Sequence, residues 1–171
     1  GSYDVVNGDT LRLFIDDVQA ASKPGPGSIS INGGITYVAQ AGNGAQPFVG
    51  SLDEMSYFKA GLVQADVDAL YAAGNAGQSV PTCGNCQQPL AHWTFEDSSN
   101  ATVSDLVGTS PGTNIAGSVP VPGKVATGLR FVDVGDYVSV ADAAVLNPTS
   151  ALTIALWINS TATLGPTGVE T

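Results

Sequence analysis

The sequence predicts an all-β fold with one short helix. Apolar and polar residues alternate in short segments that Gly, Pro and Asn separate, whereas only one segment has the helical spacing of apolar residues. With 171 residues, 43% of them apolar, the chain can form one ordinary domain or two small ones around a sizeable core. It has no run of 18 apolar residues, so we expect no membrane insertion.

Seven segments are predicted as strands, because apolar residues recur in them at about every second position. They are residues 10–16, 28–32, 48–58, 90–95, 128–131, 136–140 and 151–158. Within 48–58, Leu52 and Met55 can both point inward only if a bulge interrupts the strand. Trp93 and Trp157 are predicted as core residues, because tryptophan usually serves packing in all-β proteins.

One helix is predicted over residues 64–73, where apolar residues share one face. Asp66 suits the positive N-terminal end of this helix, and Gly74 is a natural C-cap. Residues 75–89 have no periodicity and contain two prolines, which indicates a linker.

The linker holds both cysteines of the chain, Cys83 and Cys86. This stretch is rich in turn residues and lacks a thioredoxin-like context, and the chain offers too few Cys and His ligands for a zinc site. We expect a small-loop disulfide formed in an oxidising compartment, with free or intermolecular thiols as the alternative.

The charge of the chain excludes several partners. Five Lys and Arg face fifteen Asp and Glu, which gives a net charge of −10. Such a chain cannot neutralise a phosphate backbone, so we expect no nucleic-acid partner, and an anionic membrane surface would repel it. An acidic, Lys-poor composition fits an extracellular or cell-surface protein, and its carboxylates suit hard cations such as Ca²⁺.

A series of motifs resembles laminin-G-like domains, which have the concanavalin A-like lectin/glucanase jelly-roll fold. The closing half of that fold is similar to 10–17 (TLRLFIDD), 47–54 (PFVGSLDE) and 70–74 (LYAAG). The opening half is similar to 91–97 (AHWTFED), 123–125 with 128–131 (GKV, GLRF), 135–138 (GDYV) and 152–157 (LTIALW). The resemblance implies an all-β jelly-roll sandwich.

The two halves stand in reversed order. Residues 1–74 resemble the C-terminal half of a laminin-G-like jelly roll, 75–89 form the linker, and 90–171 resemble the N-terminal half. One explanation is that the chain is a segment of a tandem repeat array, with the end of one repeat followed by the start of the next. The other is a permuted unit, whose half-domains pair within one chain or are completed by neighbouring chains. In either case 90–95 is expected to pair with 48–58. The family's middle strands are missing, which would leave edges open for pairing with copies of the chain.

The resemblance also implies a Ca²⁺ ion. Its ligands would come from Asp53, from Glu96 or Asp97, and from the turn between Asp133 and Gly135. Carboxylates and carbonyls on three elements could supply the oxygens that Ca²⁺ requires. The alternative is that these carboxylates are solvated turn residues or helix caps.

We expect no catalytic activity. Asp53 and Glu54 are adjacent on a predicted strand, which would place them on opposite faces and not together in a glycosidase cleft. His92 has no Ser or Cys partner in a recognisable spacing, so we expect a structural histidine.

The predicted function is a non-catalytic extracellular or cell-surface protein for adhesion or structural assembly, pairing with itself in a filament or repeat array. The alternative is a Ca²⁺-dependent carbohydrate-binding module with glycans as partners. A polysaccharide-acting enzyme is a remote third.

Overall fold

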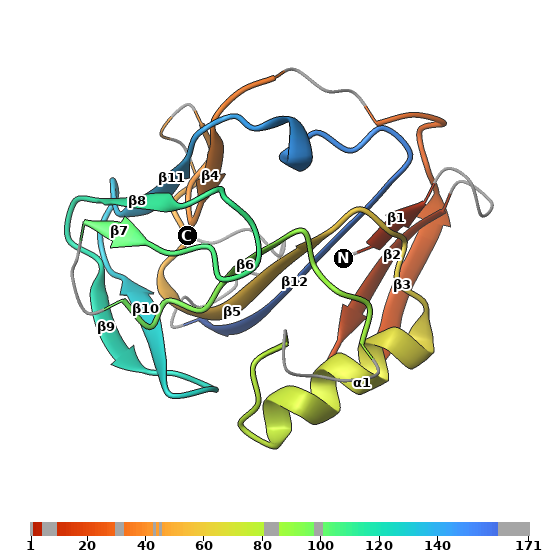
Figure 1. Cartoon of the computed structure of the whole chain (residues 1–171), viewed down its shortest axis with the longest axis horizontal. Coiled ribbons are helices and arrows are strands. Elements are labelled where there is room, and N and C mark those ends of the chain that lie inside the picture. The colour runs from red at the N-terminus through yellow and green to blue at the C-terminus, as the bar shows by residue number, and fades with distance from the viewer. Residues whose placement is uncertain are drawn as a thin grey trace, which may run out of the picture.

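The computed structural model describes residues 2–4, 10–29, 33–42, 44, 46–80, 86–97 and 101–160. These residues form mainly antiparallel β-strands with one α-helix, which confirms the all-β class (Figure 1). The strands are β1 (Ser2–Asp4), β2 (Thr10–Ile15), β3 (Val18–Pro24), β4 (Thr36–Val38), β5 (Gly50–Phe58), β6 (Ala91–Trp93), β7 (Thr102–Val103), β8 (Gly112–Ile115), β9 (Val119–Pro122), β10 (Thr127–Phe131), β11 (Tyr137–Val140) and β12 (Ala151–Ser160). The helix α1 spans Gln64–Asn75, and a 3-10 turn, η2, spans Ala144–Leu146.

The strands form two sheets. The larger has eight strands in the order β3-β2-β1-β12-β5-β10-β9, with β6 also paired to β5, and the smaller has the order β4-β11-β8-β7. Strands from residues 1–74 lie beside strands from residues 90–160 in both sheets: β12 pairs with β1 and β5, and β4 pairs with β11. The expected pairing of 90–95 with 48–58 is present as β5 with β6, where Met55 lies opposite Trp93.

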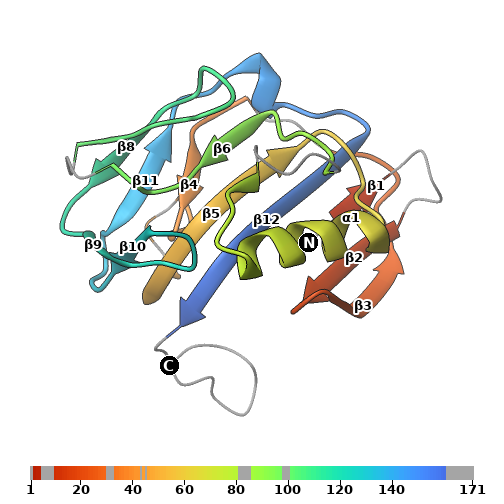
Figure 2. The ribbon, with the colours of Figure 1, turned by 60° about the horizontal axis from the view of Figure 1, so that its bottom comes forward.

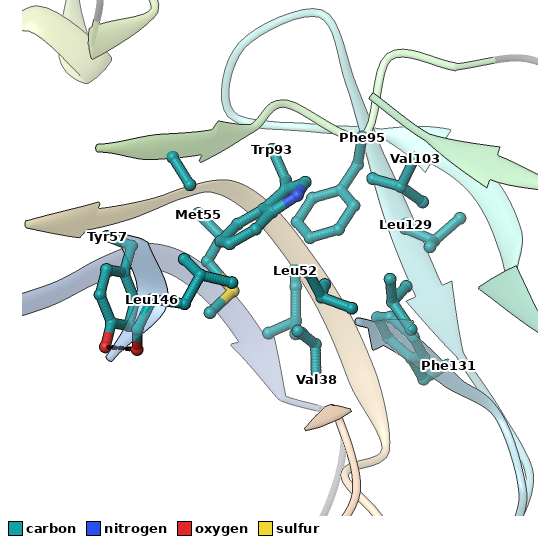
Figure 3. Close-up of a cluster of buried hydrophobic side chains, with 13 residues drawn as sticks. Val38, Leu52, Met55, Tyr57, Trp93, Phe95, Val103, Leu129, Phe131 and Leu146 are labelled. Atoms are coloured by element: carbon teal, nitrogen blue, oxygen red, sulfur yellow. Dashed lines mark hydrogen bonds between the residues drawn. The ribbon is translucent and has the colours of Figure 1, made fainter. Parts of the chain in front are cut away.

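The main core lies between the two sheets (Figure 3). Its buried side chains come from both sheets, from the segment after β6 and from η2: Val38, Leu52, Met55, Tyr57, Ala91, Trp93, Phe95, Val103, Leu129, Phe131, Val138, Val140 and Leu146. The buried indole N–H of Trp93 donates to the carbonyl of Ser110 (2.9 Å) and the hydroxyl of Tyr57 donates to the carbonyl of Leu146 (2.8 Å), so neither polar group is left unpaired.

A bulge interrupts β5, as the spacing of Leu52 and Met55 requires. Glu54 has φ +52°, and the register with β12 shifts between Ala155 and Trp157. The extra residue turns Met55 to the same side as Leu52, and both enter the core between the sheets.

The helix packs on the other side of the larger sheet. Val67 and Leu70 of α1 contact a second buried cluster formed by Phe58, Leu62 and Val80. Asp66 stands in the first turn, where its carboxylate accepts the backbone N–H of Val63 (3.1 Å).

Two local expectations are not met. Gly74 lies inside α1, which continues to Asn75, so it is not the C-cap. Residues 28 and 29 are not in a strand, and the rest of the predicted strand 28–32 lies outside the described residues. No helix in the described residues is long and apolar enough to cross a membrane.

Candidate functional site

Three acidic side chains meet at the bulge of β5. Ligand-capable oxygens of Asp53, Glu54 and Glu96 all lie within 4.8 Å of one another. The expectation that Asp53 and Glu54 point to opposite faces is wrong. It assumed a regular strand, and the bulge at Glu54 rotates the backbone so that adjacent side chains converge.

Asp53 is buried, and only one of its two carboxylate oxygens accepts hydrogen bonds from the described residues. Its Oδ2 accepts the backbone N–H groups of Lys124 (2.6 Å) and Val125 (2.9 Å), while its Oδ1 is buried and accepts no hydrogen bond within the described chain. Gly123 permits this approach, since a Cβ there would lie 2.5 Å from Oδ2. Burial raises the pKa of Asp53 to about 6. The backbone N–H donors oppose this rise, and the negative charge of Glu54 adds to it.

Glu54 is 3% exposed, and neither carboxylate oxygen accepts a hydrogen bond from the residues described. His92 lies within ion-pair distance, with its Nε2 3.2 Å from Oε2 of Glu54. His92 is fully buried, with Ser56 Oγ 2.8 Å from Nδ1 and Ser79 Oγ 2.8 Å from Nε2. The expectation that His92 has no Ser partner is therefore wrong: residues 36 and 13 positions away in the sequence bring hydroxyls to both ring nitrogens, which satisfies the buried ring.

Glu96 completes the cluster from the exposed side. Its Oε1 accepts the backbone N–H of Thr127 (3.0 Å). Three carboxylates, two of them with buried oxygens that lack donors, form an oxygen-rich set suited to a hard cation such as Ca²⁺, which draws its remaining ligands from water and carbonyl groups.

The other predicted cation ligands lie outside this cluster. Asp97 accepts the backbone N–H and the hydroxyl of Ser104. The turn with Asp133 and Gly135 is organised by Asp136, whose Oδ2 accepts the backbone N–H of Asp133 (3.1 Å). Among the described residues, the metal-capable group contains Asp53 and Glu96 but neither Asp97 nor Asp133.

The carboxylates of Asp53 and Glu54 border different hollows. Asp53 lines a hollow of about 250 Å³ together with Lys124 and Trp157. Glu54 lines a larger cavity of about 460 Å³ between β2, α1 and β12.

The sequence patterns predict neither Glu54 as a site residue nor the larger cavity. The spacing of Leu52 and Met55 was the available signal, because it requires a bulge and a bulge brings Glu54 beside Asp53.

The cysteine stretch is described in part. Cys86 is buried and disulfide-bonded. Cys83 lies outside the described residues.

Comparison of the chain with protein-family models, with curated proteins and with solved structures finds no match.

Proposed function

We propose that this chain is a non-catalytic structural or adhesion protein of the cell exterior that assembles with other copies of itself by pairing along β3. The observation that carries this proposal is the edge strand itself. Among the described strands β3 ends the larger sheet and pairs with β2 alone, and it is exposed at all seven of its residues. An open strand edge offers N–H and C=O groups to a strand of another chain.

The opposite edge of the sheet is protected. β9 contains Pro120 and Pro122, and each proline lacks the N–H that a further strand would need. In β3 the comparable protections, a lysine and a proline, occupy only the last two positions, Lys23 and Pro24. The contrast between the edges favours β3 as the surface for assembly.

Apolar side chains accompany the open edge. The β2–β3 hairpin exposes Leu11, Leu13, Ile15 and Val18, with exposed fractions from 39% to 62%. The smaller sheet does not cover them, since β1, β2 and β3 lie at the opposite end of the molecule from β4, β8 and β11 (Figures 1 and 2). An apolar patch at a free edge marks an interaction surface.

The proposal includes the finer fold, a concanavalin A-like jelly roll, and the extracellular location. Two antiparallel sheets around one core and the laminin-G-like motifs support the jelly roll. The disulfide at Cys86 supports an oxidising compartment.

Light scattering and electron microscopy at increasing protein concentration test the assembly. We expect particles larger than the 17.2 kDa chain for the wild type and monomers for Val18→Lys, which places a charge beside the open edge. Val119→Lys is the matched control, because Val119 is an exposed valine on the proline-protected edge. A wild type that stays monomeric, or a Val119→Lys variant that dissociates as Val18→Lys does, overturns the proposal.

A second candidate is Ca²⁺-dependent carbohydrate binding, favoured by the unpartnered oxygens of Asp53 and Glu54 beside Glu96. A glycan array probed with and without Ca²⁺ tests it, with Asp53→Asn as the variant that removes a cation ligand. Hits that need both Ca²⁺ and Asp53 support the candidate. An array without hits removes it. For either candidate, turnover on a panel of polysaccharides would contradict the non-catalytic assignment.

A further inference from the structure

The larger cavity is lined mainly by residues of β2 and the turn after it, of α1 and of β12. Figure 2 shows these three elements close together. The volume of the cavity, about 460 Å³, is in the range of small-molecule sites. Most of the lining is apolar and includes Phe14, Leu62, Val67, Leu70 and Leu156. Such a surface gains free energy when it buries a hydrocarbon or aromatic group.

All the charged groups of the lining are acidic. Asp16 and Asp17 stand in the turn between β2 and β3, and Glu54 contributes a buried carboxylate. In the described part of the chain, no Lys, Arg or His is among the residues that line the cavity. The cavity therefore carries negative charge without a cationic side chain of its own.

Glu54 is the buried carboxylate among the acidic residues of the lining. Its two oxygens accept no hydrogen bond from the described residues, and its ion-pair contact, His92 Nε2 at 3.2 Å from Oε2, is to a ring whose two nitrogens also face serine hydroxyls. A buried carboxylate with so few donors is costly, and a ligand that brings N–H donors and a positive charge lowers that cost.

We propose that the cavity binds an amphipathic amine, a molecule with one protonated amino group and an apolar body of moderate size. The ammonium group donates N–H bonds to Glu54, and the apolar body lies against α1 and β12. A quaternary ammonium has no N–H to donate, and a carboxylate meets only like charges, so both bind more weakly than a primary amine of the same chain length.

This site is separable from the cation cluster, although both use Glu54. Asp53 and Glu96 belong to the cluster, yet neither is among the residues that line the larger cavity. Of the three carboxylates in the cluster, Glu54 alone lines the cavity, so a change at Glu54 is expected to alter both cation and amine binding.

The test uses four probes with the same eight-carbon chain: octylamine, octyltrimethylammonium, octanol and octanoate. Binding is followed in chelator by the fluorescence of Trp157, which lines the cavity, while Trp93 is buried in the core. We expect octylamine to bind at least about tenfold more tightly than octanol, as a hydrogen bond to a charged group implies. Octyltrimethylammonium should fall below octylamine, and octanoate should bind most weakly.

Two isosteric variants complete the test. Glu54→Gln should lower octylamine affinity to that of octanol, and Asp142→Asn, a control that removes an exposed carboxylate outside both the cavity and the cation cluster, should leave it unchanged. Equal binding of octylamine and octanol by the wild type overturns the proposal, as does an equal loss in the two variants. If circular dichroism shows that Glu54→Gln does not fold, the order of the four probes on the wild type decides the question.

Discussion

Gly74 of α1 lies directly under the indole ring of Trp157 in β12, so close that a Cβ on Gly74 would stand 2.4 Å from Trp157 Cζ2. Tyr71, one turn earlier in the helix, stacks on the same ring with a centroid distance of 5.4 Å, and Lys124 Nζ lies 4.7 Å from the ring centroid. The ring is thereby fixed between the helix and its neighbours, which leaves it little room to move away from a larger residue at position 74.

Replacing Gly74 with Ala should therefore destabilise the protein, although Ala favours a helix by about 1 kcal/mol relative to Gly. Overpacking typically costs about 1–3 kcal/mol, so we expect a net loss of up to about 2 kcal/mol in the free energy of unfolding, measured by urea denaturation. Gly34→Ala is the control, because a Cβ there meets nothing within 4 Å. An unchanged stability of Gly74→Ala would show that the helix moves away from β12 at little cost.

Sequence patterns locate the regular elements well and the irregular ones poorly. Alternation finds β5, β10, β11 and β12, because each of these strands has a face packed in the main core. It also finds β2, although the alternating Leu11, Leu13 and Ile15 of that strand are exposed. It assigns Gly74 to a helix cap, since nothing local reveals that Trp157 approaches this residue from 83 positions away. Long-range contacts of this kind have no signature in neighbouring residues.

The acidic site illustrates the same limit. Asp53 and Glu96 were expected to approach one another on the basis of the resemblance, whereas Glu54 enters the group only through the bulge. Asp105 shows how a carboxylate can take a different role: it accepts four backbone N–H groups, those of His92, Val107, Gly108 and Ser110, and thereby ties β6 to the following loop. A carboxylate that accepts backbone N–H groups and one whose oxygens accept none look alike in sequence.

Asp136 should make the protein less stable in acid. Burial acts to raise the pKa of Asp136, but the backbone N–H groups of Val132, Gly117 and Asp133 outweigh it, and the pKa lies below the ordinary value of 3.8. A depressed pKa means that the unfolded chain binds the proton more tightly, so the stabilisation is complete above about pH 4 and is lost as the pH falls through the pKa of the folded state.

Urea denaturation between pH 2 and pH 6 measures this effect. The wild type should lose stability steeply below pH 4, and Asp136→Asn should show a shallower loss because it lacks the titrating group. Asp142→Asn provides the comparison, since Asp142 is exposed and bonded to Asn147 at the surface. Identical pH profiles for the wild type and Asp136→Asn would contradict the assigned role.

Calcium should stabilise the folded chain if the carboxylates of Asp53, Glu54 and Glu96 bind it. A ligand that binds only the folded state adds about 2.7 kcal/mol at one hundred times its Kd, and calorimetry would record the corresponding rise in Tm. Asp53→Asn should abolish the rise and Glu96→Gln should reduce it. Asp97→Asn should preserve it, because Asp97 bonds to Ser104 outside the cluster. A rise in Tm that depends on Asp97 but not on Glu96 would show that the calcium ligand is Asp97 and not Glu96.

Salt should promote the proposed assembly along β3. Each chain carries a net charge of −10, so two chains repel one another at low ionic strength, and the Debye length shortens from about 30 Å at 0.01 M to about 8 Å at 0.15 M. Apolar contacts through Leu13 and Val18 do not weaken with this screening, so particle size in light scattering should grow as NaCl is raised over that range. Dissociation by salt would instead indicate an interface held by ion pairs. With Lys23 the only charged residue in β3, such an interface would have to lie elsewhere on the molecule.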